Sequence, residues 1–180
     1  MASSSRSLLS ILVVLLAATT ATATTEVKNF EDIKVSGDQV CSRTRSPGFC
    51  FGVLPPGITK QSLETVSNDL INKAMVEATD IYNQIKYWIP QAAGAQQGHL
   101  NYCLRLYSSA INSIKAARNL LGSKHYFGLN RKTVEIANYA NTCESSFSSS
   151  PRAVSPLTQQ NSDFFNLVDV LSATSYLLSH

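Results

Sequence analysis

The chain has 180 residues, of which 44% are hydrophobic and 15% are charged, and its formal net charge is +3 at pH 7. Arg6 is the only charged residue among residues 1–23, so the chain without these residues has a formal charge of +2. A charge this small, spread over scattered lysines and arginines, argues against a nucleic-acid-binding or membrane-surface protein.

The first 23 residues have the three zones of a signal peptide. Arg6 is followed by an apolar run over residues 8–18 and by the small residues 21–23, which predicts cleavage after Ala23. A membrane anchor is the alternative, but the apolar run is far shorter than the roughly 20 residues that a spanning helix needs. We therefore expect a secreted protein whose mature part, residues 24–180, forms one domain.

Residues 24–57 form a segment of irregular composition. No helical or strand period is sustained in it, and residues 41–57 contain several prolines and glycines between two cysteines. This pattern predicts an irregular N-terminal extension closed by a short loop.

Two long helices are predicted in the first part of residues 58–180. Apolar residues recur at helical spacing from Leu63 to Trp88, and Pro90 and Gly94 should end this first helix. A second apolar stripe runs from Leu100 to Leu121, with Gly122 where a C-terminal cap belongs.

Two further helices complete the chain. A third stripe runs from Ile136 to Phe147. The fourth helix is predicted to open at residues 155–156, a capping serine followed by a proline at the first helical position, and its apolar residues run from Phe164 to Leu178. Short connections between four amphipathic helices predict an all-α protein, an antiparallel four-helix bundle over residues 58–180.

Four cysteines in a secreted chain predict two disulfides. Cys103 lies 20 residues before Ser123 in the turn and Cys143 lies 20 residues after it, so both sulfurs should stand at the same height on two antiparallel helices. We therefore predict the pairs Cys103–Cys143 and Cys41–Cys50. A zinc site would need clustered ligands, which the sequence lacks, and we expect no metal or cofactor.

The sequence has no recognisable catalytic motif. The zinc-protease, nucleophile-elbow and nucleotide-binding patterns are all missing from the chain. His125 beside the turn is interpreted as a cap or surface residue, and Glu135 and Glu144 are expected to lie on one solvated helix face. The protein is therefore predicted not to be an enzyme.

Residues 41–50, CSRTRSPGFC, resemble the Cys-x-x-Thr-x-x-Pro-x-x-Cys segment of the plant invertase and pectin methylesterase inhibitor family. Three later segments resemble the same family in the same order: residues 103–110 (CLRLYSSA), residues 140–147 (ANTCESSF) and residues 154–161 (VSPLTQQN) with the leucines at 177–178. The resemblance covers about residues 38–179. It implies a bundle with an N-terminal helical hairpin, the same two disulfides, and one-to-one docking on a secreted carbohydrate-active enzyme of the apoplast or cell wall, with the vacuole less favoured.

The resemblance also suggests contact residues. Pectin methylesterase inhibitors of this family tend to carry acidic residues at the positions occupied here by Arg105, Ser109 and Asn112, whereas Thr142 matches the family. These four residues are the predicted partner-binding set.

Two target enzymes stay open. The invertase branch carries a Pro-Lys-Phe element after the second helix, while residues 122–127 here read GSKHYF. The compact turn favours pectin methylesterase, and an acid invertase is the alternative.

Two further kinds of function also stay open. Many small residues on the helices could leave an apolar cavity for a carried small molecule, or could simply let the helices pack closely. A regulatory role with no enzyme target is the other possibility.

Overall fold

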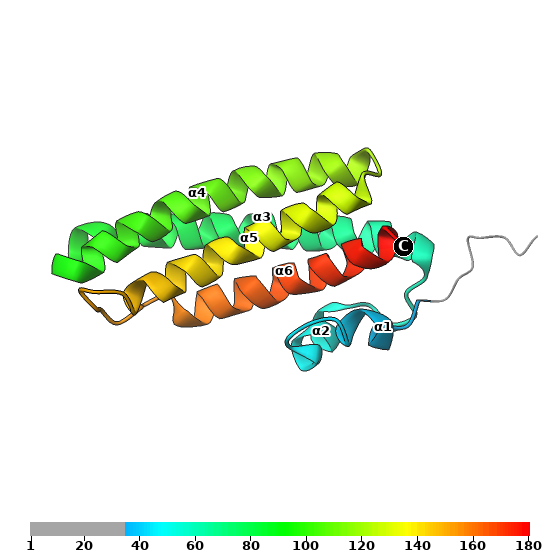
Figure 1. Cartoon of the computed structure of the whole chain (residues 1–180), viewed down its shortest axis with the longest axis horizontal. Coiled ribbons are helices and arrows are strands. Elements are labelled where there is room, and N and C mark those ends of the chain that lie inside the picture. The colour runs from blue at the N-terminus through cyan, green and yellow to red at the C-terminus, as the bar shows by residue number, and fades with distance from the viewer. Residues whose placement is uncertain (1–34) are drawn as a thin grey trace, which may run out of the picture.

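The computed structural model describes residues 35–180, so the predicted signal peptide and the start of the extension lie outside the described residues. Figure 1 shows the order of the elements along the chain. They are α1 (Gly37–Cys41), α2 (Pro47–Val53), α3 (Lys60–Trp88), the short 3₁₀ helix η2 (Ile89–Gln91), α4 (Gly94–Gly122), α5 (Tyr126–Phe147) and α6 (Thr158–Leu178).

The four long helices form an antiparallel bundle, which confirms the predicted fold class. α4 packs on α5, α5 on α6, and α3 closes the ring by contacting both α4 and α6. The short helices α1 and α2 form a separate hairpin that packs against α6. Across residues 35–180, no helix combines the length and hydrophobicity that crossing a membrane requires.

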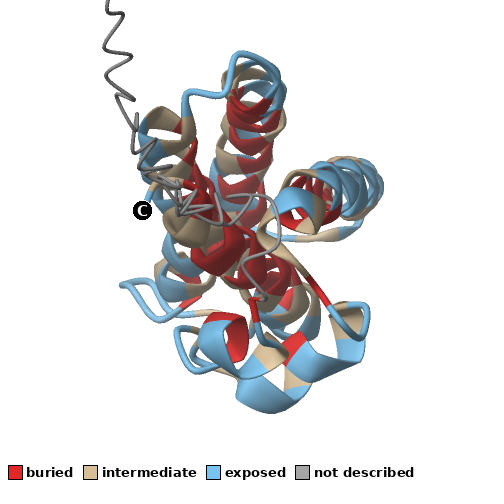
Figure 2. Ribbon diagram, turned by 90° about the vertical axis from the view of Figure 1, so that its right-hand side faces the viewer, coloured by how far each residue is buried: buried red, intermediate tan, exposed pale blue. Residues whose placement is uncertain are grey.

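The apolar stripes of the four helices meet along the bundle axis, where buried residues line the inside (Figure 2). Tyr107 of α4 and Phe164 of α6 are the two largest fully buried side chains, and their ring centroids lie 5.5 Å apart. Burying an aromatic or branched side chain stabilises a fold by roughly 1.5–3 kcal/mol. The apolar residues that recur at helical spacing therefore stabilise the fold mainly by packing in this core.

The turn after α4 differs from the sequence-based expectation. Gly122 is the last residue of α4 and not its left-handed cap; the left-handed residue is Lys124, with φ 55°. The backbone N–H groups of Lys124 and His125 donate to the carbonyls of Leu121 and Leu120, at 2.9 and 2.8 Å. These bonds satisfy the end of α4 and offset the cost of a side chain in the left-handed region.

The start of α6 also differs. Ser155 and Pro156 lie before the helix, which begins at Thr158. The Ser155 hydroxyl accepts a hydrogen bond from the Leu157 N–H at 3.2 Å and donates to Glu144 of α5 at 2.8 Å. Ser155 therefore ties the loop to α5 instead of capping α6.

Candidate functional site

The N-terminal hairpin of α1 and α2 is closed by a disulfide, and the loop between the two helices contacts α6. The structure contains the Cys41–Cys50 disulfide, and the Arg45 N–H donates to Asp169 of α6 at 2.7 Å. The guanidinium groups of Arg43 and Arg45 lie 4.4 and 4.5 Å from the ring centroids of Tyr176 and Phe165. These cation–π contacts hold the hairpin on α6.

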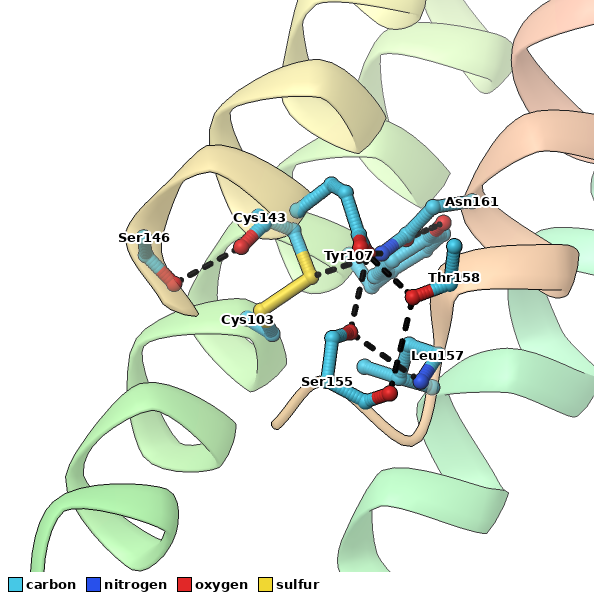
Figure 3. Close-up of a disulfide and its surroundings, with 9 residues drawn as sticks. Cys103, Tyr107, Cys143, Ser146, Ser155, Leu157, Thr158 and Asn161 are labelled. Atoms are coloured by element: carbon cyan, nitrogen blue, oxygen red, sulfur yellow. Dashed lines mark hydrogen bonds between the residues drawn. A yellow bond between two sulfur atoms is a disulfide. The ribbon is translucent and has the colours of Figure 1, made fainter. Parts of the chain in front are cut away.

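The second disulfide links Cys103 of α4 to Cys143 of α5, with Cα atoms 4.8 Å apart and both residues fully buried (Figure 3). A second link lies further along the same pair of helices, where the Ser113 hydroxyl donates to Glu135 at 2.7 Å. The two links fix the register of α4 against α5.

A buried polar network adjoins this disulfide and was not anticipated from the sequence. The Tyr107 hydroxyl donates to the Asn161 side-chain oxygen at 2.7 Å, and the Asn161 amide donates to Glu144 at 2.7 Å (Figure 3). Burial raises the pKa of Tyr107, with smaller contributions from Glu77 and Glu144, so the hydroxyl stays protonated as a donor. The network connects α4, α5 and α6.

The expectation that Glu135 and Glu144 share one solvated face is wrong. Nine residues at 100° per residue leave half a turn, so the two carboxylates lie on opposite sides of α5. Glu144 accepts from hydroxyl and amide groups of the loop and α6, at 2.6–2.8 Å. Glu135 accepts from Ser113 and Tyr139, and pairs with Lys132 at 2.6 Å, which lowers its pKa.

The four predicted contact residues lie on one outer side of the molecule. Arg105, Ser109 and Asn112 are spaced four and three apart, so they form one stripe on α4. Arg105, Asn112 and Thr142 are exposed and Ser109 is half-buried. Because Arg105 follows Cys103 by two residues and Thr142 precedes Cys143 by one, antiparallel helices place them within about 1.5 Å of the same height.

Two large apolar side chains on the outside of α5 were missed in the sequence analysis. Phe127 is 63% exposed and Val134 is 51% exposed. They lie seven residues apart, on one stripe, and out of phase with the buried residues of α5. That phase difference is a sequence signal that could have identified them.

We call the surface formed by the outward-facing residues of α4 and α5 the α4–α5 face. It consists of Arg105, Ser109 and Asn112 of α4 with Phe127, Arg131, Val134 and Thr142 of α5.

The connection between α4 and α5 is tied to α3. The Tyr126 hydroxyl donates to Glu64, and the Lys124 ammonium lies 3.8 Å from the same carboxylate. Burial and the bond to Glu64 raise the pKa of Tyr126 to about 12. The turn is therefore held against the bundle and does not project from it.

A groove of about 490 Å³ runs along α3 on the outside of the bundle. It is lined by Asn72, Lys73, Val76, Glu77, Asp80, Ile81 and Gln84 from α3 and by Gln160 from α6, and the surface that these residues expose to it is mostly apolar. The groove is open to solvent on the outside of the bundle, so it is not an enclosed cavity between the helices that would bury most of a carried molecule. The groove thus gives the small-molecule-carrier alternative no support.

Glu77 in this groove makes stability depend on pH. Burial, followed by the charges of Asp163 and Asp80, raises its pKa to about 7 from the ordinary 4.5 of a glutamate. The cost of ionising Glu77 in the folded protein is absent below pH 4.5 and complete above about pH 7. The unfolding free energy should therefore fall as pH rises between these values. Solvent screening at this partly exposed site reduces the expected loss to about 1–2 kcal/mol.

Glu77→Gln should remove this contribution. Urea unfolding at pH 5 and pH 8 is expected to show a smaller stability difference for the variant than for the parent protein. Asp69→Asn, at an exposed carboxylate on the same helix, is the matched control and should keep the parent difference. An unaltered pH difference in Glu77→Gln would contradict the assignment.

Taken together, the fold and the α4–α5 face define a class of small, disulfide-linked helical bundles that present an outer helix surface. The chain belongs to the plant invertase/pectin methylesterase inhibitor family, whose model matches residues 35–173. This is a family of inhibitor proteins.

The relatives include pectinesterase inhibitors and putative invertase inhibitors. The chain is 28% identical to a pectinesterase inhibitor from Actinidia deliciosa over 143 residues, covering 78% of this chain and 77% of the relative. It is 33% identical to a putative invertase inhibitor from Platanus acerifolia over 84 residues, 47% of each chain. The crystal structure of a mutant pectin methylesterase inhibitor from Arabidopsis has the same fold, with a TM-score of 0.69 at 19% identity over 79% of this chain and 97% of that one.

Proposed function

We propose that this protein is a secreted inhibitor of pectin methylesterase that has no enzymatic activity of its own. The observation that carries the proposal is the similarity to a pectinesterase inhibitor over most of both chains, whereas the similarity to the Platanus invertase inhibitor spans about half of each. The compact α4–α5 turn, held against α3 through Tyr126 and Glu64, also supports this target.

The proposed mechanism is occlusion. The α4–α5 face, including Arg105, Ser109, Asn112 and Thr142, would cover the rim of the enzyme's cleft and keep the polymer out. An interface of about 1,600 Å² in total is enough for a stable complex of this kind. The disulfide between α4 and α5 keeps the face rigid, so little conformational entropy is lost on docking.

Secretion to the apoplast or cell wall is part of the proposal. It is supported by the signal-peptide pattern of residues 1–23 and by two disulfides, which persist in oxidising compartments. The mature chain, residues 24–180, is proposed to be one inhibitor domain comprising the hairpin extension and the bundle.

An acid invertase is the second candidate target. The chain is 33% identical to the putative invertase inhibitor, although over only 84 residues. An acid invertase is therefore included in the inhibition assays.

Parallel inhibition assays distinguish the two targets. With pectin methylesterase held well above the dissociation constant, we expect activity to fall linearly to zero at one inhibitor per enzyme, and invertase to remain active. The inhibitor alone should release neither methanol from pectin nor glucose from sucrose. Inhibition of invertase alone would transfer the proposal to the alternative, and inhibition of neither enzyme would refute the function while leaving the fold.

A further inference from the structure

Charge is unevenly divided between the two halves of the bundle. Residues 94–147, which contain α4, α5 and their turn, have six basic and two acidic residues, a formal charge of +4. Helices α3 and α6 together have three basic and six acidic residues, a formal charge of −3. The modest net charge of the whole chain therefore conceals a strongly dipolar molecule.

The two acidic residues of the basic half both have polar partners, although the side chain of Glu135 is 42% exposed. Glu135 is held in the seam with α4 by Ser113, Tyr139 and Lys132. Glu144 is held on the opposite side of α5 by Ser155, Thr158 and Asn161. α4 itself contains no aspartate or glutamate.

Two basic residues of this half point outward on the α4–α5 face, whereas Lys124 and Lys132 are paired with carboxylates. Arg105 of α4 and Arg131 of α5 are both exposed. The Arg105 guanidinium lies 5.5 Å from the Tyr102 ring centroid, a contact that favours one orientation of the long side chain. Phe127 lies one helical turn before Arg131 on α5, and Val134 follows Arg131 by three residues, so apolar and basic groups share one stripe.

From this distribution we infer that the α4–α5 face docks on an acidic surface of the target enzyme, with Phe127 and Val134 as apolar anchors and Arg105 and Arg131 as the charges that steer the approach. The inference rests on the proposed function and deepens it by naming the chemistry of the partner surface, which is opposite in charge to the surface that the acidic residues of related pectin methylesterase inhibitors would select. Charge of this kind accelerates association, and desolvated aromatic anchors slow dissociation.

A protein surface fits this face better than a linear polyanion does. Two exposed apolar side chains, 63% and 51% accessible, gain from being covered by apolar groups of a folded partner. A uronate polymer has no comparable apolar surface, and it would be drawn by charge alone. The polymer is therefore treated as a competing outcome of the test.

The test compares two charge reversals in protein secreted from the full chain. Arg105→Glu/Arg131→Glu alters the α4–α5 face, and Lys73→Glu/Lys86→Glu alters exposed residues of α3 by the same total charge. At 50 mM salt the first variant should associate with the inhibited enzyme at least tenfold more slowly than the parent, and the control less than twofold. Raising the salt to 500 mM should slow the parent and remove most of this difference.

A third variant tests the apolar part of the face. Phe127→Ala should leave the association rate within twofold and increase the dissociation rate at least tenfold. Thermal unfolding of each variant checks that the bundle remains folded.

Several results would overturn the inference while leaving the inhibitory function in place. These are equal rates for both charge reversals, tighter binding by Arg105→Glu/Arg131→Glu, or a dissociation rate unaffected by Phe127→Ala. Retention of the parent on immobilised polygalacturonate, lost in the arginine variant while its inhibition is unaltered, would assign the face to the polymer. A parent protein that inhibits neither enzyme would refute both proposals.

Discussion

Asn161→Ala is expected to lower the unfolding free energy by about 3 kcal/mol. Asn161 is only 3% exposed, and its side chain is the partner of both Tyr107 and Glu144. Truncation removes two hydrogen bonds, one of them to a carboxylate, and leaves the buried Tyr107 hydroxyl without a partner, whereas Glu144 keeps Ser155 and Thr158. The lost bond to a carboxylate contributes about 1.5–3 kcal/mol, and the unsatisfied hydroxyl costs about 1–3 kcal/mol.

Urea unfolding followed by circular dichroism measures this loss. Asn138→Ala, at an exposed asparagine on α5, is the matched control and should stay within about 0.5 kcal/mol of the parent. Tyr107→Phe should cost about 1–2 kcal/mol, because it removes only the bond between the hydroxyl and Asn161. Equal stabilities of Asn161→Ala and the control would show that the network contributes nothing.

Removing the Cys103–Cys143 disulfide is expected to destabilise the protein by about 4 kcal/mol. The two cysteines are 40 residues apart, and the chain-entropy model gives that magnitude for a loop of this length. The same model gives about 3 kcal/mol for Cys41–Cys50, whose separation is 9. Cys103→Ala/Cys143→Ala should therefore lower the melting temperature more than Cys41→Ala/Cys50→Ala.

Calorimetry of the two double variants makes the comparison. Peptide mapping of the unreduced parent should first recover the linked pairs Cys41–Cys50 and Cys103–Cys143. A crossed pairing would invalidate the register of α4 against α5. A larger loss for the shorter loop would show that hairpin packing on α6, and not chain entropy, dominates.

The candidate contact residues show what the spacing of residues along one helix can predict and what it cannot. Arg105, Ser109 and Asn112 could be placed on one stripe because residues three and four apart on a helix are neighbours. Placing Thr142 beside that stripe required the register of two helices, which the equal distances of Cys103 and Cys143 from the turn already indicated. Their role in binding stays a prediction until the variants are measured.

Polar contacts between helices were less predictable. The partners of Glu135 and Glu144 outside α5 lie 11 to 22 residues away in the sequence, and those of Asn161 lie 17 and 54 residues away. Such pairs form only where packing brings two helix sides together, and no local pattern encodes them. The same reason explains why Ser155, a good capping residue by sequence, is used to bind Glu144 instead.

By itself, the amino-acid sequence determined the number of long helices, their buried stripes and the disulfide pairs, because these follow from a 3.6-residue period and from chain geometry near one turn. It did not give the start of α5, which begins at Tyr126, before the first residue of the predicted stripe, Ile136. Tertiary structure decided which polar side chains form hydrogen bonds between helices, and it left Phe127 and Val134 exposed on the outside of α5, the helix that packs beside α4. It also divided a near-neutral chain into a basic and an acidic half. The physical reason is that burial and charge separation depend on which sides of the helices meet, and that is settled only when the four stripes pack into one core.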